Sequence, residues 1–311
     1  MQYQWYPGHM SKAKRQIQDE LKLVDVIIEL VDARIPYSSK NPDIEKFAGN
    51  KPRVLLLNKA DLADDARTKE YKAYYEKKGY FVLTVNSKAG SGVKNVLNVV
   101  KEACKEKRER DLKRGIIGRP LRAMIVGIPN VGKSTFINSF AGKSVTLVGN
   151  KPGVTKGKQW IRLNKELELL DTPGILWPKF EDQQVGLRIA WIGSINEDIL
   201  DVRELAMTLL AYLYEEYPGV INAKYGIEEC ADGFEALERV ARKRGCLKKG
   251  GEADIERASG IIMDDYRAGK IGRITLERVE KEEPKAEEVQ KVAKENATEL
   301  SSSGVTKTEE K

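Results

Sequence analysis

The octapeptide GIPNVGKS, at residues 127–134, has the glycine spacing and the Lys-Ser pair of a phosphate-binding loop. An apolar run precedes it and a stretch typical of a helix follows it, so backbone N–H groups and a helix N-terminus would surround bound phosphates. The Lys133 ammonium would reach the β- and γ-phosphates, and the Ser134 hydroxyl would bind magnesium. The expected nucleotide ligands of this loop are Asn130, Val131, Gly132, Lys133, Ser134 and Thr135.

The tetrapeptide DTPG, at residues 171–174, follows another apolar run downstream of this loop. Its Asp171 carboxylate would hold the magnesium shell, and the Gly174 N–H would contact the γ-phosphate. Between the two motifs lies NKPGVTKG, in which Thr155 could close on magnesium through its hydroxyl. We therefore expect magnesium as a cofactor, with Ser134, Thr155 and Asp171 as its ligands, and we expect Lys133 and Thr155 to serve catalysis.

The motif NKAD, at residues 58–61, follows a third apolar run and carries a carboxylate suited to guanine. Guanine presents N1–H and an exocyclic amine side by side, and Asp61 could accept from both, whereas adenine lacks that donor pair. Asn58 would contact the base edge, and the Lys59 stem would cover the ring. In VNSKAGSG, after the next apolar run, backbone N–H groups near Ser87 would meet the guanine O6. The expected guanine ligands are Asn58, Lys59, Asp61, Asn86, Ser87 and Lys88, and an ATPase is disfavoured.

The order of these motifs is unusual, because the base motifs precede the phosphate loop. In ordinary GTPases the phosphate loop comes first. A circular permutation of the same sheet would produce this order, and chain ends that lie close together make such a rearrangement tolerable. The former ends would be joined by residues 101–122, which carry nine basic and four acidic side chains.

The elements that must position these motifs alternate between short β-rich apolar runs and helical stretches, which predicts an α/β fold with a mostly parallel sheet. We expect six strands, the last two as a hairpin around Asn164. The flanking helices include one capped by Ser11 and others near 64–78 and 92–110.

Beyond Trp177 only helical patterns occur, at 185–194, 201–217, 232–245 and 254–272. The stretch from Glu282 onward has low hydrophobicity and indicates disorder. We therefore predict a circularly permuted P-loop GTPase domain at 1–178, an all-helical domain at 179–281, to which the resemblance described below gives an RNA-binding role, and a disordered charged tail at 282–311.

The composition favours a polyanionic partner. The chain of 311 residues has a net charge of +7, although the stretch from Glu282 onward holds eight acidic and five basic side chains. The rest of the chain therefore has a net charge near +10. This charge is consistent with an RNA partner, and equally with a lysine-rich surface that only keeps the protein soluble. No run of 18 apolar residues occurs, so no membrane partner is expected. No secretory pattern opens the sequence, and the three cysteines are far apart, so we expect reduced thiols and a cytoplasmic location.

The order of motifs, together with WYPGHMSKA near the start and DYRAGKIGRITLE near Glu280, resembles the circularly permuted GTPases of the YlqF/RbgA ribosome-biogenesis family. The resemblance covers nearly the whole chain up to about Glu280. It implies binding of GTP and GDP, and GTP hydrolysis coupled to late assembly of the large ribosomal subunit and its rRNA. It also implies a helical domain similar to RNA-binding antiterminator modules.

One catalytic part is missing from the motifs. Many GTPases place a glutamine immediately after DTPG to orient the attacking water, but here that residue is Ile175. The resemblance assigns a hydrolytic role to His9, the single histidine of the chain, which Pro7 and Gly8 deliver in a short turn. An imidazole can hydrogen-bond water near neutral pH. The alternatives are that His9 packs or caps a helix, and that hydrolysis is simply slow.

The resemblance to potassium-stimulated GTPases implies that Asn130 helps to bind a potassium ion, and the alternative is that Asn130 only shapes the turn. We further expect the short interval between DTPG and the first helix near Val185 to couple the nucleotide to the helical domain. Two other functions stay open at this point. One is a GTP-gated RNA-binding scaffold with little turnover, and the other is a GTPase that acts in tRNA processing or translation.

Overall fold

The computed structural model of the protein describes residues 17–145, 159–172, 182–195, 200–228, 230 and 232–279. Several residues that the sequence analysis singles out lie outside these ranges, namely His9, Ser11, Thr155, Gly174, Ile175 and the tail at 282–311. The chain divides into two compact units, Met1–Glu277 and Arg278–Lys311. The boundary expected at residue 178 falls within the first unit and stays a prediction.

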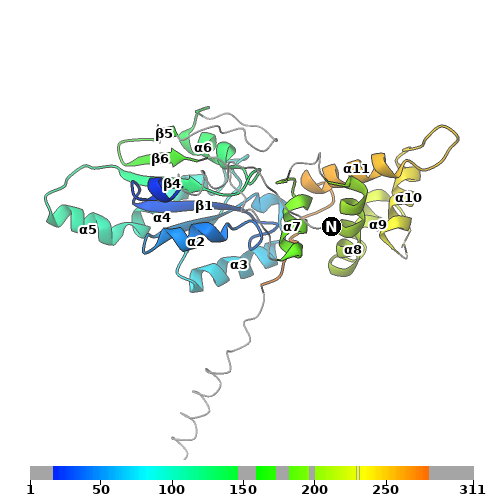
Figure 1. The fold of residues 1–311 in the computed structure, drawn as a ribbon, viewed down its shortest axis with the longest axis horizontal. Helices are drawn as coiled ribbons and strands as arrows, with labels where there is room; N and C mark the ends of the chain where they lie inside the picture. The colour runs from blue at the N-terminus through cyan, green and yellow to red at the C-terminus, as the bar shows by residue number, and fades with distance from the viewer. Residues whose placement is uncertain are drawn as a thin grey trace, which may run out of the picture. The chain divides into compact units, whose positions relative to one another are not determined.

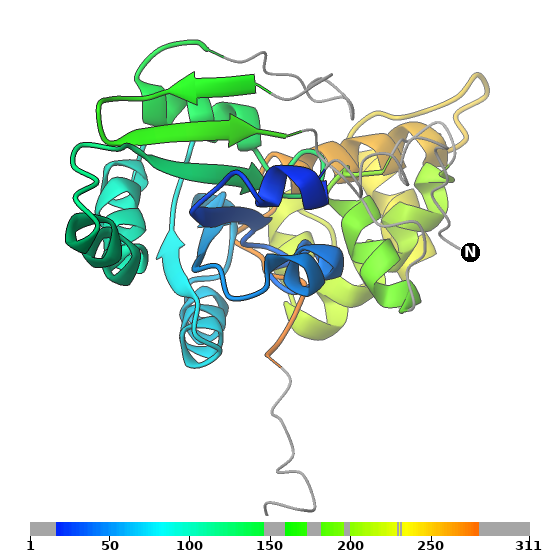
Figure 2. The ribbon, with the colours of Figure 1, turned by 60° about the vertical axis from the view of Figure 1, so that its left-hand side comes forward.

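Six strands of the described residues form one sheet, with the order β3-β2-β1-β4-β6-β5 (Figures 1 and 2). The first five strands in this order run parallel, and β5 pairs antiparallel with β6. The predicted six-stranded, mostly parallel sheet is confirmed. The strands are β1 (Val26–Asp32), β2 (Arg53–Asn58), β3 (Phe81–Thr84), β4 (Leu121–Val126), β5 (Gln159–Arg162) and β6 (Leu167–Asp171).

Parallel strands bring their carboxyl ends to the same edge of the sheet, and here that edge collects the predicted motifs. Asp32 at the end of β1 is in register with Asn58 at the end of β2, and Ile125 of β4 is in register with Asp171 of β6. Every residue of β1 is buried, which is typical of a parallel strand covered on both faces. The hairpin expected around Asn164 is present, since the Asn164 side chain accepts from the backbone N–H of Leu167 at 2.9 Å.

The helices that flank the sheet depart from the sequence prediction in two places. The single stretch expected at 92–110 breaks at Cys104, because α4 buries Val96 and Val100 whereas α5 buries no side chain. A helix between β1 and β2 was not predicted, although Asn41 caps it and Pro42 begins it. The flanking helices are α2 (Pro42–Ala48), α3 (Asp65–Lys77), α4 (Val96–Ala103), α5 (Lys105–Lys113) and α6 (Lys133–Ala141), and short 3-10 turns η1 (Ala60–Leu62) and η2 (Val93–Asn95) follow β2 and β3.

The regular elements that the structure describes after β6 are all helices, as predicted (Figure 1). We call the elements α7 to α11 the helical region, and they are α7 (Gln183–Trp191), α8 (Val202–Glu216), α9 (Val220–Tyr225), α10 (Gly233–Lys243) and α11 (Ile255–Arg267). The last helix ends at Arg267 rather than near residue 272, because the chain turns at Gly269, whose φ angle is 72°. In the ranges described above, none of the helices combines the length and apolar character that crossing a bilayer demands.

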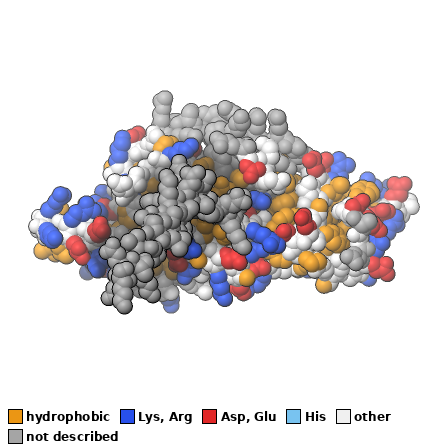
Figure 3. Space-filling view, turned by 90° about the horizontal axis from the view of Figure 1, so that it is seen from below, with side chains coloured by type: hydrophobic (Ala, Val, Ile, Leu, Met, Phe, Trp, Pro, Cys, Tyr) orange, Lys and Arg blue, Asp and Glu red, His pale blue; other side chains and the backbone are white. Residues whose placement is uncertain are grey.

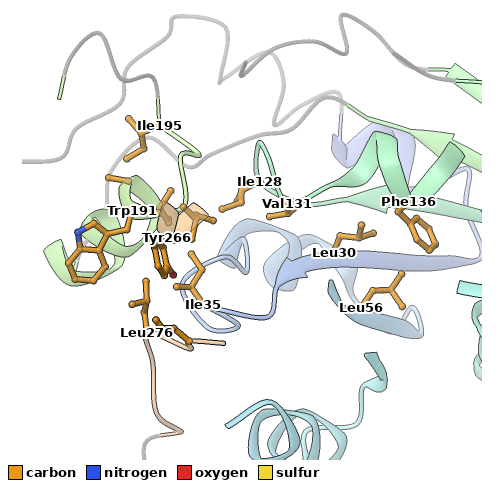
Figure 4. Close-up of a cluster of buried hydrophobic side chains, with 14 of the residues drawn as sticks. Leu30, Ile35, Leu56, Ile128, Val131, Phe136, Trp191, Ile195, Tyr266 and Leu276 are labelled. Carbon is orange, nitrogen blue, oxygen red and sulfur yellow. The ribbon is translucent and has the colours of Figure 1, made fainter. Parts of the chain in front are cut away.

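One hydrophobic cluster runs from the sheet into the helical region (Figure 4). Leu30 and Leu56 come from the sheet, Val131 comes from the phosphate loop, and Trp191 and Tyr266 come from α7 and α11. Burial of apolar surface is the main stabilising contribution in folding, at roughly 25 cal/mol per Å². The helical region and the sheet edge therefore share a core instead of meeting only through polar contacts.

The segment after α11, residues 270–277, returns to the sheet edge. The backbone N–H of Ile274 donates to the Leu62 carbonyl at 3.0 Å, and that of Leu276 donates to the Arg34 carbonyl at 2.7 Å. The Glu277 carboxylate accepts from the backbone N–H of Ser38 at 2.9 Å. This segment thus lies against the loops that follow β1 and β2, beside the predicted base motif.

Candidate nucleotide-binding site

The phosphate loop connects β4 to α6, and two of its positions require glycine. Gly127 and Gly132 have φ angles of 153° and 96°. A Cβ atom on Gly127 would lie 2.5 Å from the Leu30 carbonyl oxygen, and one on Gly132 would lie 2.5 Å from Nδ2 of Asn58. Only residues without side chains let the loop approach β1 and the base motif so closely.

Two buried opposite charges lie at this loop. The Lys133 ammonium donates to the carbonyl oxygens of Gly127 at 2.8 Å and Ile128 at 3.0 Å, and burial lowers the pKa of Lys133 to about 8. Asp171, beside Ile125 of β4, is 1% exposed. Burial raises the pKa of Asp171 to about 6, against the opposing charge of Lys133. Each group therefore sits where its charged form is disfavoured, as expected of a site that receives ligand charges.

The surroundings of Asp171 fit a magnesium ion. Both of its carboxylate oxygens are buried without a hydrogen-bond partner among the described residues, so a cation would satisfy them. Ser134 lies in the first turn of α6. In the described part of the chain no three His, Cys, Asp or Glu side chains gather into a metal cluster. A magnesium ion here would rely on one carboxylate, hydroxyls and the phosphates themselves, which is its usual mode with nucleotides.

Asn58 connects the base motif to both neighbouring loops. Its Nδ2 donates to the Val131 carbonyl of the phosphate loop at 2.7 Å. Its Oδ1 accepts from the backbone N–H of Ser87 at 3.1 Å and from the Ser87 hydroxyl at 2.7 Å. Asn58 and Ser87 are both buried, so these contacts are shielded from water. The geometry brings together three segments that the sequence analysis assigned to one nucleotide.

Lys59 also reaches the phosphate loop. Its backbone is left-handed, with φ 58° and ψ 34°, and its ammonium donates to the Asn130 carbonyl at 2.7 Å. Asp61 is exposed in the η1 turn, and Lys88 is exposed after β3, so both side chains can approach a base. The Asn86 Oδ1 instead accepts from a backbone N–H within its own turn, that of Ala89, at 2.9 Å.

Two residues of this edge were missed by the sequence analysis. Asp32 ends β1 and pairs with Lys59 at 3.0 Å, and Arg34 binds both carboxylate oxygens of Asp32, at 2.9 and 2.8 Å. Asp32 and Arg34 are 0% and 1% exposed. A carboxylate immediately after a buried strand is the signal that drew attention to Asp171, and the same signal was present at Asp32.

Asn130 occupies a strained position, with a φ angle of 60°. Its Nδ2 donates to the Gly193 carbonyl, in the turn after α7, at 2.6 Å. The neighbouring Pro129 carbonyl accepts from the Ser194 hydroxyl at 2.7 Å. The phosphate loop is therefore tied to the helical region as well as to the base motif. His9, Thr155 and Gly174, the other residues assigned to this site, lie outside the described residues.

The strand order and these loop contacts define a P-loop GTPase whose chain visits the parts in permuted order. Residues 122–224 match a family described as 50S ribosome-binding GTPase. A ribosome biogenesis GTPase A of Bacillus cereus is 46% identical over 293 residues, which cover 94% of this chain and 99% of the relative. The chain belongs to the ribosome biogenesis GTPase A family, also called YlqF or RbgA, and the resemblance expected from the motifs is confirmed.

More distant relatives agree over most of the chain. A ribosome biogenesis GTPase A of Thermotoga maritima is 38% identical, covering 89% of this chain and 94% of its own. The crystal structure of GNP-bound YlqF from T. maritima superposes with a TM-score of 0.61 at 33% identity, over 86% of this chain and 99% of that one. The protein is therefore a GTP hydrolase that serves ribosome assembly and binds GTP and GDP, and GTPases of this family generally use magnesium.

Proposed function

We propose that the protein acts on the large ribosomal subunit and binds its rRNA through the helical region. The observation that carries the proposal is the match of residues 122–224 to a family described as 50S ribosome-binding GTPase. A cytoplasmic location belongs to the same proposal, since that is where such a particle would be met. RNA binding requires a positively charged surface that can reach phosphates.

The surface that supports RNA binding is the turn between α10 and α11. The stretch RKRGCLKK, residues 242–249, holds five basic and no acidic side chains. Those five side chains are exposed, whereas Cys246 in their midst is buried and anchors the turn. Carboxylates stand among the Lys and Arg side chains elsewhere at this end of the molecule (Figure 3). Arg239, for example, pairs with Glu235 at 2.7 Å, and within the stretch Arg242 pairs with Glu238 at 2.8 Å. The charge is therefore concentrated in one turn.

The experiment replaces Arg242, Lys243 and Arg244 with alanine and measures binding to large-subunit particles over a range of salt concentrations. We expect weaker binding and a flatter salt dependence, because each lost phosphate contact lowers the slope by roughly 0.7–0.9. A matched control removes the same charge from exposed α5 through Lys105→Ala, Arg108→Ala and Lys113→Ala. GTP binding should survive in both variants. An equal loss in the control would show that bulk charge, not this turn, binds the particle.

For hydrolysis, we propose that Ser134, Thr155 and Asp171 hold magnesium, which would neutralise the phosphate charge that develops during transfer. Lys133 would turn from the loop carbonyls to the β- and γ-phosphates. Ile175 cannot orient a water molecule, because its side chain has no polar atom, so His9 would do so when the particle is bound. Turnover measured with and without large subunits separates this activity from a GTP-gated scaffold.

Potassium binding at Asn130 is a further part of the proposal. The Asn130 amide would have to exchange its contact with the Gly193 carbonyl for one with the ion. Turnover should then be faster in potassium chloride than in sodium chloride, and Asn130→Gly should remove the difference. Glycine keeps the left-handed backbone of this position, so the variant tests the side chain alone. Equal turnover of the wild type in the two salts would exclude the potassium site.

A further inference from the structure

A closed ring of polar contacts joins the base motif, the phosphate loop and the helical region. Lys59 binds the Asn130 carbonyl and Asp32, and Asp32 binds Arg34. Arg34 binds the carbonyl of Arg267, whose own guanidinium binds the carbonyls that end α7. The turn after α7 closes the ring through Asn130. Its members are Lys59, Asp32, Arg34, Arg267, Ala190, Trp191, Gly193 and Asn130.

Arg34 is the buried cation of this ring, and it connects Asp32 to Arg267. Its Nε and one terminal nitrogen bind the two oxygens of Asp32, and its other terminal nitrogen donates to the Arg267 carbonyl at 3.3 Å. That carbonyl belongs to the last residue of α11, where the helix dipole favours a cation. The guanidinium also lies 5.3 Å from the ring centroid of Tyr266. Arg34 therefore contacts the site on one side and the end of α11 on the other.

The charges in this group depend on one another. Burial alone would raise the pKa of Asp32, but the charges of Arg34 and Lys59 outweigh it and hold that pKa well below its usual range. Burial lowers the pKa of Lys59, and Asp32 partly opposes the shift. Because Arg34 occupies both oxygens of Asp32, Lys59 can keep its shorter contact, 2.7 Å, to the phosphate loop. Without Arg34, Lys59 would be the one cation among the described residues left to neutralise the buried Asp32 carboxylate.

We propose that Arg34 is a positioning residue for the nucleotide, acting through Asp32 to hold the Lys59 ammonium at the phosphate loop. Because Arg34 also binds the carbonyl that ends α11, nucleotide affinity depends on this one contact rather than on the attachment of the helical region in general. The inference rests on the proposal that this protein binds guanine at NKAD, where the Lys59 stem would cover the base. The proposal explains the position of Lys59 by two residues, Asp32 and Arg34, that lie outside the nucleotide motifs.

The first test compares Arg34→Lys with Arg34→Met, two unbranched side chains of similar length. Equilibrium binding of fluorescent GDP and of a GTP analogue is measured for variants that show a folded circular dichroism spectrum. We expect Arg34→Met to lose about tenfold affinity for both nucleotides, the equivalent of one hydrogen bond to a charged group. Arg34→Lys should recover most of that loss, because it returns a cation to Asp32. Equal affinities of the two variants would reduce Arg34 to a packing role and overturn the proposal.

The second test asks whether Arg34 acts through Lys59. In a Lys59→Ala background, Arg34→Met should cause no further loss of affinity, although it should still lower the unfolding midpoint of the nucleotide-free protein. An undiminished loss in that background would overturn the proposal. The matched control is Arg67→Met. Arg67 lies in α3 and also connects a helix of the sheet to the helical region. Arg67 binds Glu216, the Thr275 carbonyl and the Tyr212 hydroxyl, and it touches none of the ring.

Arg67→Met should lower stability and leave nucleotide affinity unchanged. If Arg67→Met lost as much affinity as Arg34→Met, the effect would come from a general loosening of the helical region. That result would overturn the positioning role of Arg34. Asp61→Asn reports separately on guanine recognition. Retained GTP affinity in that variant would refute the guanine site, whereas a loss there with no loss at Arg34 would refute only the positioning role.

Discussion

Replacing Asp171 with asparagine should stabilise the nucleotide-free protein at neutral pH. The carboxylate is 1% exposed, and neither oxygen has a hydrogen-bond partner among the described residues. Its pKa of about 6 lies above the value of 3.8 expected for the unfolded chain. The folded state therefore holds the proton more tightly, so stability falls as the pH rises from about 4 to about 6 and stays low above that.

The size of the effect follows from this shift. At about 1.36 kcal/mol per pKa unit, the charged carboxylate lowers the free energy of unfolding by roughly 3 kcal/mol above pH 6. A buried asparagine has no charge to desolvate, but its amide keeps a penalty of about 1 kcal/mol or more. We therefore expect Asp171→Asn to raise the free energy of unfolding by about 1–2 kcal/mol at neutral pH. The gain should shrink toward pH 4, where the wild-type carboxyl is also uncharged.

Urea unfolding without ligand measures the stability that the Asp171 carboxylate costs, and unfolding with magnesium and GDP measures the stability that ligand binding adds. At a ligand concentration of about 100 Kd the wild type should gain roughly 2.7 kcal/mol, whereas the variant should gain much less. Glu168→Gln is the matched control on the same strand, because Glu168 is a partly exposed partner of Arg122. A variant less stable than the wild type in the nucleotide-free state at neutral pH would refute the reasoning, since it would mean that the favourable effects of Lys133 and the Thr172 backbone N–H outweigh the cost of burying the charge.

Three further changes test other parts of the site. Asp61→Asn should weaken GTP binding by about 1–3 kcal/mol, because an acceptor facing the guanine N1–H and amine becomes a donor, and titration should show a gain for the xanthosine nucleotide. Gly132→Ala should lower nucleotide affinity, because its Cβ would lie 2.5 Å from Nδ2 of Asn58, and normal affinity would contradict the close approach. His9→Ala should leave GTP and particle binding nearly intact and remove most particle-stimulated turnover. Full stimulation would refute the role of His9, and lost particle binding would indicate docking instead.

The motifs and the sheet could be predicted because each depends on a short stretch of sequence. Apolar runs end in the polar residues that a parallel sheet collects at one edge, and GIPNVGKS and NKAD each carry their chemistry within a few residues. The order of the motifs was enough to predict the permuted sheet. Helix boundaries were less predictable, because the break at Cys104 depends on α4 packing against the sheet while α5 does not.

The ring around Arg34 could not be predicted from the sequence. Arg34 and the carbonyl that it binds are 233 residues apart, and no periodicity or spacing connects them. In the sequence, Asp32 and Arg34 are only two charged residues at the end of an apolar run, which is equally consistent with an exposed turn. Burial decides between the two, and burial depends on α11 and on the segment at 270–277, which fold against this edge.

Two segments next to these helices contact the nucleotide site, namely the turn after α7 and the segment after α11, and both bear on how the site is coupled to the helical region. The turn after α7 holds the phosphate loop through Ser194 and Gly193, and the segment after α11 holds the base motif through Arg273, which donates to the Ala60 carbonyl at 2.9 Å. From the sequence we expected coupling through the short interval between DTPG and the first helix near Val185, and this route would distinguish GTP from GDP because DTPG is expected to contact the γ-phosphate. Contacts to the base motif are shared by both nucleotides, so they would distinguish the loaded protein from the empty one. Particle binding that changes on adding either nucleotide would assign the coupling to the base motif, and a change with the GTP analogue alone would assign it to the interval between DTPG and the helix near Val185.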